Sequence, residues 1–121
     1  MKKKIITALL LMVAIATSAQ TISEVREEIK RQGLPCGEIV LAQARLETGN
    51  FTSRVSREKH NLFGIRQGRR YKSYRRWQDS VADYKRLISS RYHGGDYYLF
   101  LSRIRYAEDS RYIAKLKTFT R

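Results

Sequence analysis

The segment from Leu34 to Gly49 constrains the fold most, because its apolar residues do not keep to one side of a helix. Pro35 is tolerated in a first helical turn, and Gly49 suits the left-handed residue that ends a helix, so we expect one helix between them. Apolar residues on several sides indicate that other elements surround this helix. The chain is therefore expected to fold as short helices around one buried central helix.

A single carboxylate, Glu47, comes two residues before the expected end of this helix. Carbonyls at a helix C-terminus carry partial negative charge, and the edge of a core excludes water. Both effects disfavour the ionised carboxylate and raise its pKa. A carboxyl group that stays protonated near neutral pH is what a general acid needs. A solvated surface side chain is the alternative that this position alone leaves open.

Apolar residues at helical spacing predict four further short helices, which gives about five in all. The expected starts are, in order, the capping box of Thr21 and Glu24, the pair Asp79 and Ser80 with Asp83 in the first turn, Tyr97, and Asp109 or Ser110.

Between residues 52 and 77 the helical period disappears, and residues 67–70 predict the tight turn of a small hairpin. Residues 63–77 contain no Asp or Glu, and Tyr71, Tyr74 and Trp77 alternate there with Lys and Arg. This pattern indicates either a groove wall that stacks on sugar or base faces, or a solvated basic face above core aromatics.

Residues 1–19 are typical of a secretory signal peptide, with three lysines, an apolar run over 5–16 and small residues at 17–19. An uncleaved anchor is the alternative, and no later stretch is apolar enough to span a membrane. The mature chain would begin at Gln20 with 22 Lys and Arg against 11 Asp and Glu, a net charge of +11. An exported chain with that charge is expected to meet an anionic partner: the cell wall, outer-leaflet lipids or extracellular nucleic acid.

Cys36 is the single cysteine, so the chain has no internal disulfide, and we expect a small, partly buried residue there. His60 and His93 are the two histidines, and neither has a partner at metal-ligand spacing. We therefore expect no metal and no cofactor.

Four motifs occur in order along the chain: LAQARLETG at 41–49, NLFGI at 61–65, YKSY at 71–74 followed by Asp79-Ser80, and YAEDSRYIAKL at 106–116. They resemble the A-Q-x-x-L-E-[ST]-G, N-L-F-G-I, F-R-x-Y then E-S, and Y-A-T-D-x-x-Y-A-x-K-L motifs of the peptidoglycan-hydrolysing glucosaminidases. These are the endo-β-N-acetylglucosaminidase-like domains of flagellar muramidases and autolysins. The resemblance covers nearly all of residues 20–121.

The resemblance implies a lysozyme-like, mainly α (α+β) fold with a cleft between a helical lobe and a small β-hairpin lobe. It implies that Glu47 is the general acid and that Tyr106 lies near it and the sugar N-acetyl group. The implied substrate-binding residues are Asn61, Phe63 and Gly64 on the cleft floor, and Tyr71, Tyr74 and Trp77 on the hairpin side.

This chain departs from the family pattern at the position of the second carboxylate. Two-carboxylate glycosidases need a partner acid, which the family places on the hairpin, but here the hairpin is short and acid-free. Asp79 and Glu58 are the remaining candidates, with helix capping and surface charge as their alternatives. The sugar's own N-acetyl group as nucleophile, or one Glu acting as acid and then base as in lytic transglycosylases, are the favoured interpretations. A third is a domain that mainly binds.

The function expected from the sequence is therefore that of an exported, monomeric peptidoglycan hydrolase that cuts glycan strands at N-acetylglucosamine linkages. A non-catalytic cationic wall-binding module is the second hypothesis. A nucleic-acid binder is disfavoured because it does not explain Glu47 in its motif. Amide cleavage is disfavoured because the zinc or cysteine site common in such enzymes is not evident in the sequence.

Overall fold

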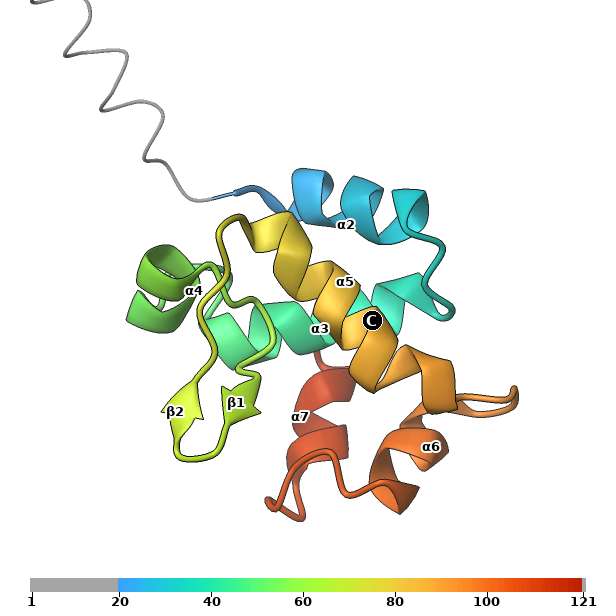
Figure 1. The fold of residues 1–121 in the computed structure, drawn as a ribbon. Coiled ribbons are helices and arrows are strands. Elements are labelled where there is room, and N and C mark those ends of the chain that lie inside the picture. The colour runs from blue at the N-terminus through green and yellow to red at the C-terminus, as the bar shows by residue number, and fades with distance from the viewer. Residues whose placement is uncertain (1–19, 121) are drawn as a thin grey trace, which may run out of the picture.

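The computed structural model describes residues 20–120, so the predicted signal peptide lies outside the described residues. Within that range the chain forms six α-helices and one small antiparallel hairpin, which confirms the mainly α, lysozyme-like class (Figure 1). The helices are α2 (Ile22–Arg31), α3 (Gly37–Thr48), α4 (Arg54–Lys59), α5 (Trp77–Leu87), α6 (Tyr97–Arg103) and α7 (Tyr112–Lys117). The strands are β1 (Arg66–Gln67) and β2 (Arg70–Tyr71), and a 3₁₀ turn, η1, spans Ser89–Arg91.

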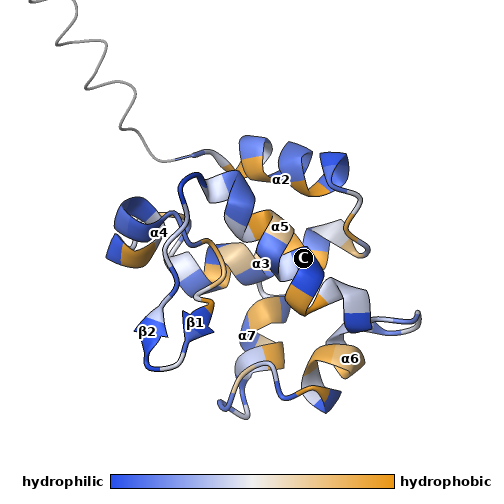
Figure 2. Ribbon diagram, viewed as in Figure 1, coloured by the Kyte–Doolittle hydropathy of each residue, from blue (hydrophilic) through white to orange (hydrophobic). Residues whose placement is uncertain are grey.

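Helix α3 is the central element, as its apolar pattern predicts. Val40, Leu41, Ala42 and Ala44 are all buried, and helices α2 and α7 pack on α3. The hydrophobic stripes of the surrounding helices face inward, whereas the hairpin is almost entirely hydrophilic (Figure 2). The core is therefore helical, and the hairpin contributes little to it.

The start of α3 differs from the prediction by two residues. The helix begins at Gly37 because Cys36 adopts a left-handed conformation, with φ of 52°, and turns the chain after Pro35. Cys36 is half-buried, as expected, and its Sγ lies 3.7 Å from the Tyr92 hydroxyl.

The predicted capping box of α2 is confirmed. The Thr21 hydroxyl accepts a hydrogen bond from the Glu24 N–H at 3.1 Å, and the Glu24 carboxylate accepts one from the Thr21 N–H at 2.9 Å. Helix α4, in contrast, forms where no helix was expected. Its N-cap Ser53 accepts a hydrogen bond from the Ser56 N–H, but so short a helix carries too few apolar residues to show a period.

The predicted start of α5 is wrong, because the helix begins at Trp77 and not after Asp79 and Ser80. The Ser80 hydroxyl lies inside the helix, where it donates to the Trp77 carbonyl at 2.6 Å and accepts from the Leu62 N–H at 3.3 Å. Asp83 is buried beyond the first turn. Asp79 and Ser80 match a capping pattern in the sequence, but in the structure Ser80 instead contacts Leu62 of a distant segment.

Asp83 ties the chain after the hairpin to α5. Its carboxylate accepts hydrogen bonds from the Tyr74 hydroxyl at 2.6 Å, the Lys72 ammonium at 2.9 Å and the Arg86 guanidinium at 2.8 Å. These partners together hold the pKa of Asp83 below its usual range, against the effect of burial.

The last two helices begin differently from one another. Helix α6 begins at Tyr97 as predicted, with the Asp96 carboxylate accepting from the N–H groups of its first turn. Helix α7 begins at Tyr112, and no side chain caps it, so the expected cap by Asp109 or Ser110 is wrong. The Asp109 carboxylate instead binds the Arg111 N–H and the Lys115 ammonium.

The predicted hairpin is confirmed, with Arg66 opposite Tyr71 and Gln67 opposite Arg70. Gly68 supplies a left-handed residue, with φ of 65°, in its two-residue turn. The hairpin projects from the helices on the side of α4 (Figure 1).

Candidate active site

Glu47 lies in the last turn of α3, and Gly49 ends that helix with φ of 56°, as predicted. The carboxyl group lines a cavity of about 460 Å³. Four segments form its walls: the end of α3, residues 63–66, the end of α5 with the following 3₁₀ turn, and the connection between α6 and α7. The cavity is thus the meeting point of segments that are far apart in the sequence.

The pKa of Glu47 is raised above its ordinary value. The side chain reaches solvent through the mouth of the cavity, while protein crowds its other sides and removes part of the water that would stabilise the charge. An interaction with the Tyr112 hydroxyl offsets part of this rise. The carboxyl group therefore keeps its proton to a higher pH than a fully solvated glutamate does.

The backbone at Gly64 lies close to the carboxyl group of Glu47. A Cβ atom at this position would lie 3.3 Å from Oε2 of Glu47 and 3.8 Å from Cε1 of Tyr71. Gly64 also has φ of 63°, a conformation that other residues adopt at a cost. The glycine is required both by the backbone and by the space beside the carboxyl group.

Asn61 holds the loop that carries Gly64. Its side chain is fully buried and donates from Nδ2 to the carbonyls of Ile65 at 2.8 Å and Lys72 at 2.9 Å. Its Oδ1 accepts from the N–H groups of Phe63 at 3.3 Å and Ile65 at 3.1 Å. Asn61 therefore shapes the cavity wall from behind rather than lining it.

Tyr106 lines the cavity together with Glu47. Its hydroxyl donates to the Phe63 carbonyl at 3.3 Å, and its ring packs 5.6 Å from that of Tyr112. Surrounding protein raises the pKa of Tyr106, so the hydroxyl remains a protonated donor.

A buried polar network below the cavity was not recognised from the sequence. The Gln43 side chain, which is fully buried, donates to the Tyr112 hydroxyl at 3.3 Å and accepts from the Tyr84 hydroxyl. Tyr84 in turn lies 2.7 Å from the Tyr97 hydroxyl. Gln43 comes four residues before Glu47, on the same face of α3, and this spacing is the signal that points to it. The network fixes Tyr112, which contacts Glu47.

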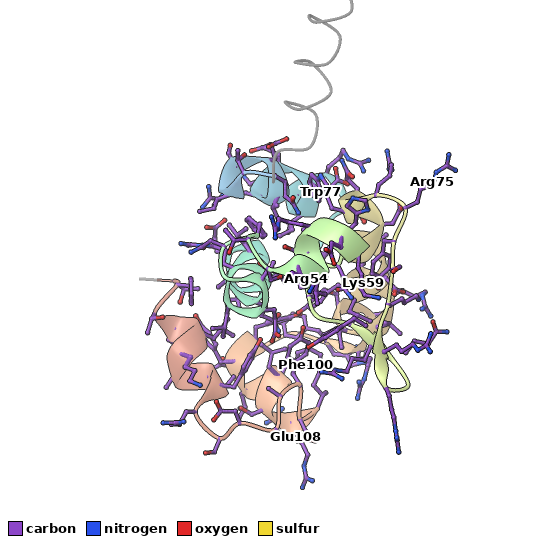
Figure 3. All side chains as sticks on the ribbon, turned by 90° about the vertical axis from the view of Figure 1, so that its left-hand side faces the viewer. Arg54, Lys59, Arg75, Trp77, Phe100 and Glu108 are labelled. Carbon is purple, nitrogen blue, oxygen red and sulfur yellow. The ribbon has the colours of Figure 1, made fainter. Side chains whose placement is uncertain are left out.

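The three predicted aromatic residues of the hairpin side lie in different places. Tyr71 is at the edge of the cavity, near Gly64, with the Arg66 guanidinium 4.3 Å from its ring centre. The Tyr74 hydroxyl binds Asp83, away from the cavity lining. Trp77 lines a separate concavity along α2, and Figure 3 shows it at the end of the molecule opposite Glu108.

Neither acid considered as a partner for Glu47 lines its cavity. Glu58 pairs with Arg54 on α4, and Asp79 lies 3.9 Å from Arg76 in the first turn of α5. Glu108 does line the cavity, and sequence reasoning missed it. It occupies the place of Thr in the Y-A-T-D motif, and that difference is the signal that identifies it.

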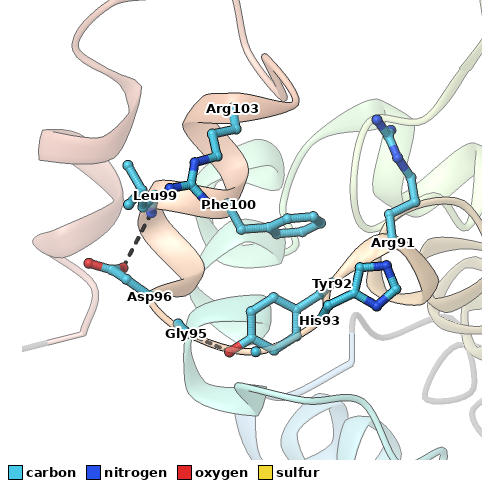
Figure 4. A pocket seen from close by; sticks show the side chains of 9 residues that line it. Arg91, Tyr92, His93, Gly95, Asp96, Leu99, Phe100 and Arg103 are labelled. Carbon is cyan, nitrogen blue, oxygen red and sulfur yellow. Dashed lines mark hydrogen bonds between the residues drawn. The ribbon is translucent and has the colours of Figure 1, made fainter.

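Arg66, Arg91 and Arg105 also line the cavity, and none of them forms an ion pair within residues 20–120. A second cavity of about 330 Å³ shares Arg91 with the first. The rings of Tyr92 and Phe100, 5.4 Å apart, lie in it between Arg91 and Arg103 (Figure 4). Two adjoining hollows thus carry cationic and aromatic side chains.

Neither a cluster of metal ligands nor a membrane-spanning helix occurs in the described part of the chain. No three His, Cys, Asp or Glu side chains gather there in a way that would hold a metal ion. No helix of residues 20–120 is both long and apolar enough to cross a membrane.

Residues 22–121 match the glucosaminidase family model, described as mannosyl-glycoprotein endo-beta-N-acetylglucosaminidase. No curated protein and no solved structure gives a match. The matched range includes the Glu47 helix, the hairpin and the Tyr106 segment. The family match supports a glycoside hydrolase that acts on peptidoglycan. The chain therefore belongs to the glucosaminidase family.

Proposed function

We propose that this chain is an exported peptidoglycan hydrolase that cuts glycan strands at N-acetylglucosamine linkages, with Glu47 as the general acid. The observation that carries the proposal is the placement of the Glu47 carboxyl group. It lines a cavity at the end of a buried helix, next to a glycine, with a raised pKa. A perturbed carboxyl group in a cleft is a strong candidate for acid catalysis.

The first chemical step follows from that placement. Glu47 donates its proton to the glycosidic oxygen as the bond from that oxygen to C1 breaks, so the leaving sugar departs as a neutral alcohol. The Tyr106 hydroxyl, 3.3 Å from the Phe63 carbonyl, lies on the same cavity wall and is suited to orient the acetamido group. Acetamido assistance and single-acid chemistry share this step and differ in what then attacks C1.

Product analysis tests the proposal. Purified sacculi are digested with the wild type and Glu47→Gln, and the fragments are identified by mass spectrometry. The proposal predicts reducing N-acetylglucosamine ends with the wild type and none above background with Glu47→Gln. Glu58→Gln, which removes an exposed acid paired with Arg54, is the matched control and should behave as the wild type. Anhydro-muramic ends would assign the chain to lytic transglycosylase chemistry instead.

A wall-binding module without catalysis is the second candidate. It is favoured by the net charge of +11 predicted for the mature chain and by the acid-free hairpin with its exposed Arg66, Arg69 and Arg70. This candidate predicts salt-sensitive pelleting with sacculi and no new ends of any kind. Export is tested separately by the intact mass of the secreted protein, which should begin at Gln20.

A further inference from the structure

Most of the acidic residues have a structural role, either in a helix cap or in an ion pair. All eleven Asp and Glu residues lie within residues 20–120. Two of them, Glu24 and Asp96, cap helices. Seven form ion pairs: Glu27, Glu28, Glu38, Glu58, Asp79, Asp83 and Asp109. The two that remain are Glu47 and Glu108, and both line the same cavity.

The backbone on both sides of Glu108 is anchored. The Tyr106 N–H donates to the Leu101 carbonyl at 3.1 Å, and Arg105 before it is held left-handed with φ of 53°. Asp109, the next residue, is held by the Arg111 N–H at 2.9 Å and the Lys115 ammonium at 2.7 Å. The Glu108 side chain itself is exposed, and no group in the described range hydrogen-bonds its carboxylate. Contacts of neighbouring residues therefore fix the position of Glu108, while its own carboxylate forms no hydrogen bond within residues 20–120.

We propose that Glu108 is the second carboxylate of the active site and activates the attacking water. The proposal rests on the proposed function of Glu47. Glu108 removes a proton from a water molecule while the water oxygen bonds to C1, the C1–oxygen bond breaks, and the proton of Glu47 passes to the leaving oxygen. The sum is hydrolysis of one glycosidic bond in a single displacement, with inversion at C1.

The cavity is large enough to hold the attacking water. Its volume of about 460 Å³ is many times the roughly 30 Å³ that one water molecule occupies, and inverting glycosidases need such room between their two carboxyl groups. Glu108 thereby supplies, from the connection between α6 and α7, the acid that the shortened hairpin lacks. Neither acetamido assistance nor a single acid is then required.

The test compares Glu108→Gln with Glu58→Gln, which removes an exposed acid that pairs with Arg54 and does not line the cavity. With soluble glycan strands, Glu108→Gln is expected to lose 10²–10⁴-fold in kcat, the usual contribution of a positioned base, with KM little changed. Glu58→Gln should keep the wild-type kcat. Azide added to Glu108→Ala should form a glycosyl azide of inverted configuration, because azide attacks without needing a base. A purely structural role would not be rescued in this way.

The stereochemistry of the wild-type product gives an independent readout. Proton NMR of the freshly released reducing end should show the inverted, α anomer before mutarotation. A retained β anomer, an anhydro-sugar, or a kcat for Glu108→Gln within threefold of wild type would overturn the assignment of Glu108. These outcomes leave Glu47 as the acid, whereas a wild type that releases no product would overturn the proposed function itself.

Discussion

Replacing Asn61 by Asp tests whether one buried amide sets the cavity wall beside Glu47. The side chains have nearly the same shape, so no cavity is made, but both Nδ2 donors are lost. The Lys72 carbonyl, 2.9 Å from Nδ2, then loses its donor, whereas the Ile65 carbonyl still accepts from the Lys72 N–H at 2.8 Å. One buried acceptor left unsatisfied costs about 1–3 kcal/mol, and a buried carboxylate that faces carbonyls costs more, so Asn61→Asp should lower the free energy of unfolding by about 2–4 kcal/mol at pH 7.

The loss should also depend on pH. Burial and the facing carbonyls raise the pKa of the introduced carboxyl group in the folded state above its unfolded value. Folding then favours the protonated form, which regains one donor. The deficit relative to wild type should therefore be small below the unfolded pKa, about 4, and grow as pH rises toward the folded pKa.

Urea unfolding followed by circular dichroism at pH 4 and pH 7 measures both effects. Gln67→Glu makes the same amide-to-acid change at an exposed position in β1 and should stay within about 0.5 kcal/mol of wild type at either pH. A deficit for Asn61→Asp below 1 kcal/mol at pH 7, or one that does not change with pH, would refute the assigned role of this amide.

Three other predictions concern the cavity and its charge. Gly64→Ala and Gly68→Ala should each lower the free energy of unfolding by about 1–2 kcal/mol in urea, because both glycines are left-handed. Only Gly64→Ala places a Cβ 3.3 Å from Glu47, so only this variant should lower kcat. Equal activities of the two variants would contradict this prediction. The pKa of Glu47 is raised in the folded state, so its stabilising contribution is complete below the unfolded pKa and is lost as pH rises through the folded pKa. At pH 8, Glu47→Gln should therefore unfold at a higher urea concentration than wild type. An unchanged urea midpoint would count against the raised pKa. Pelleting of the wild type with sacculi should fall steeply from low to high salt, as the excess of basic residues requires, and salt-independent pelleting would exclude an electrostatic contribution.

Local signals in the sequence were sufficient for much of the fold. The capping box at Thr21, the helix end at Gly49 and the turn at Gly68 each depend on residues within a few positions of one another, and the structure contains all three. Ser80 shows where such signals fail. Its hydroxyl fits a cap in the sequence, yet it binds the Leu62 N–H, eighteen residues away.

The candidate site was only partly accessible from the sequence for the same reason. Glu47 stands out because its helix ends two residues later, and that can be read locally. Glu108 and Tyr112 join it only because the chain after α6 returns to the end of α3, about sixty residues further along. Tyr74 and Trp77 belong to the aromatic and basic segment that predicted a binding wall, but neither lines the cavity. Tyr74 hydrogen-bonds to Asp83, and Trp77 lies along α2.

The most direct test of Glu47 as the general acid compares two leaving groups. Glu47→Gln is assayed on native glycan strands, whose sugar leaving group needs a proton, and on a chitooligosaccharide with a dinitrophenyl leaving group, which does not. Proton donation by Glu47 predicts a loss of 10²–10⁴-fold in kcat/KM on the strands and a loss of less than about tenfold on the dinitrophenyl substrate. Equal losses on both substrates would contradict proton donation by Glu47.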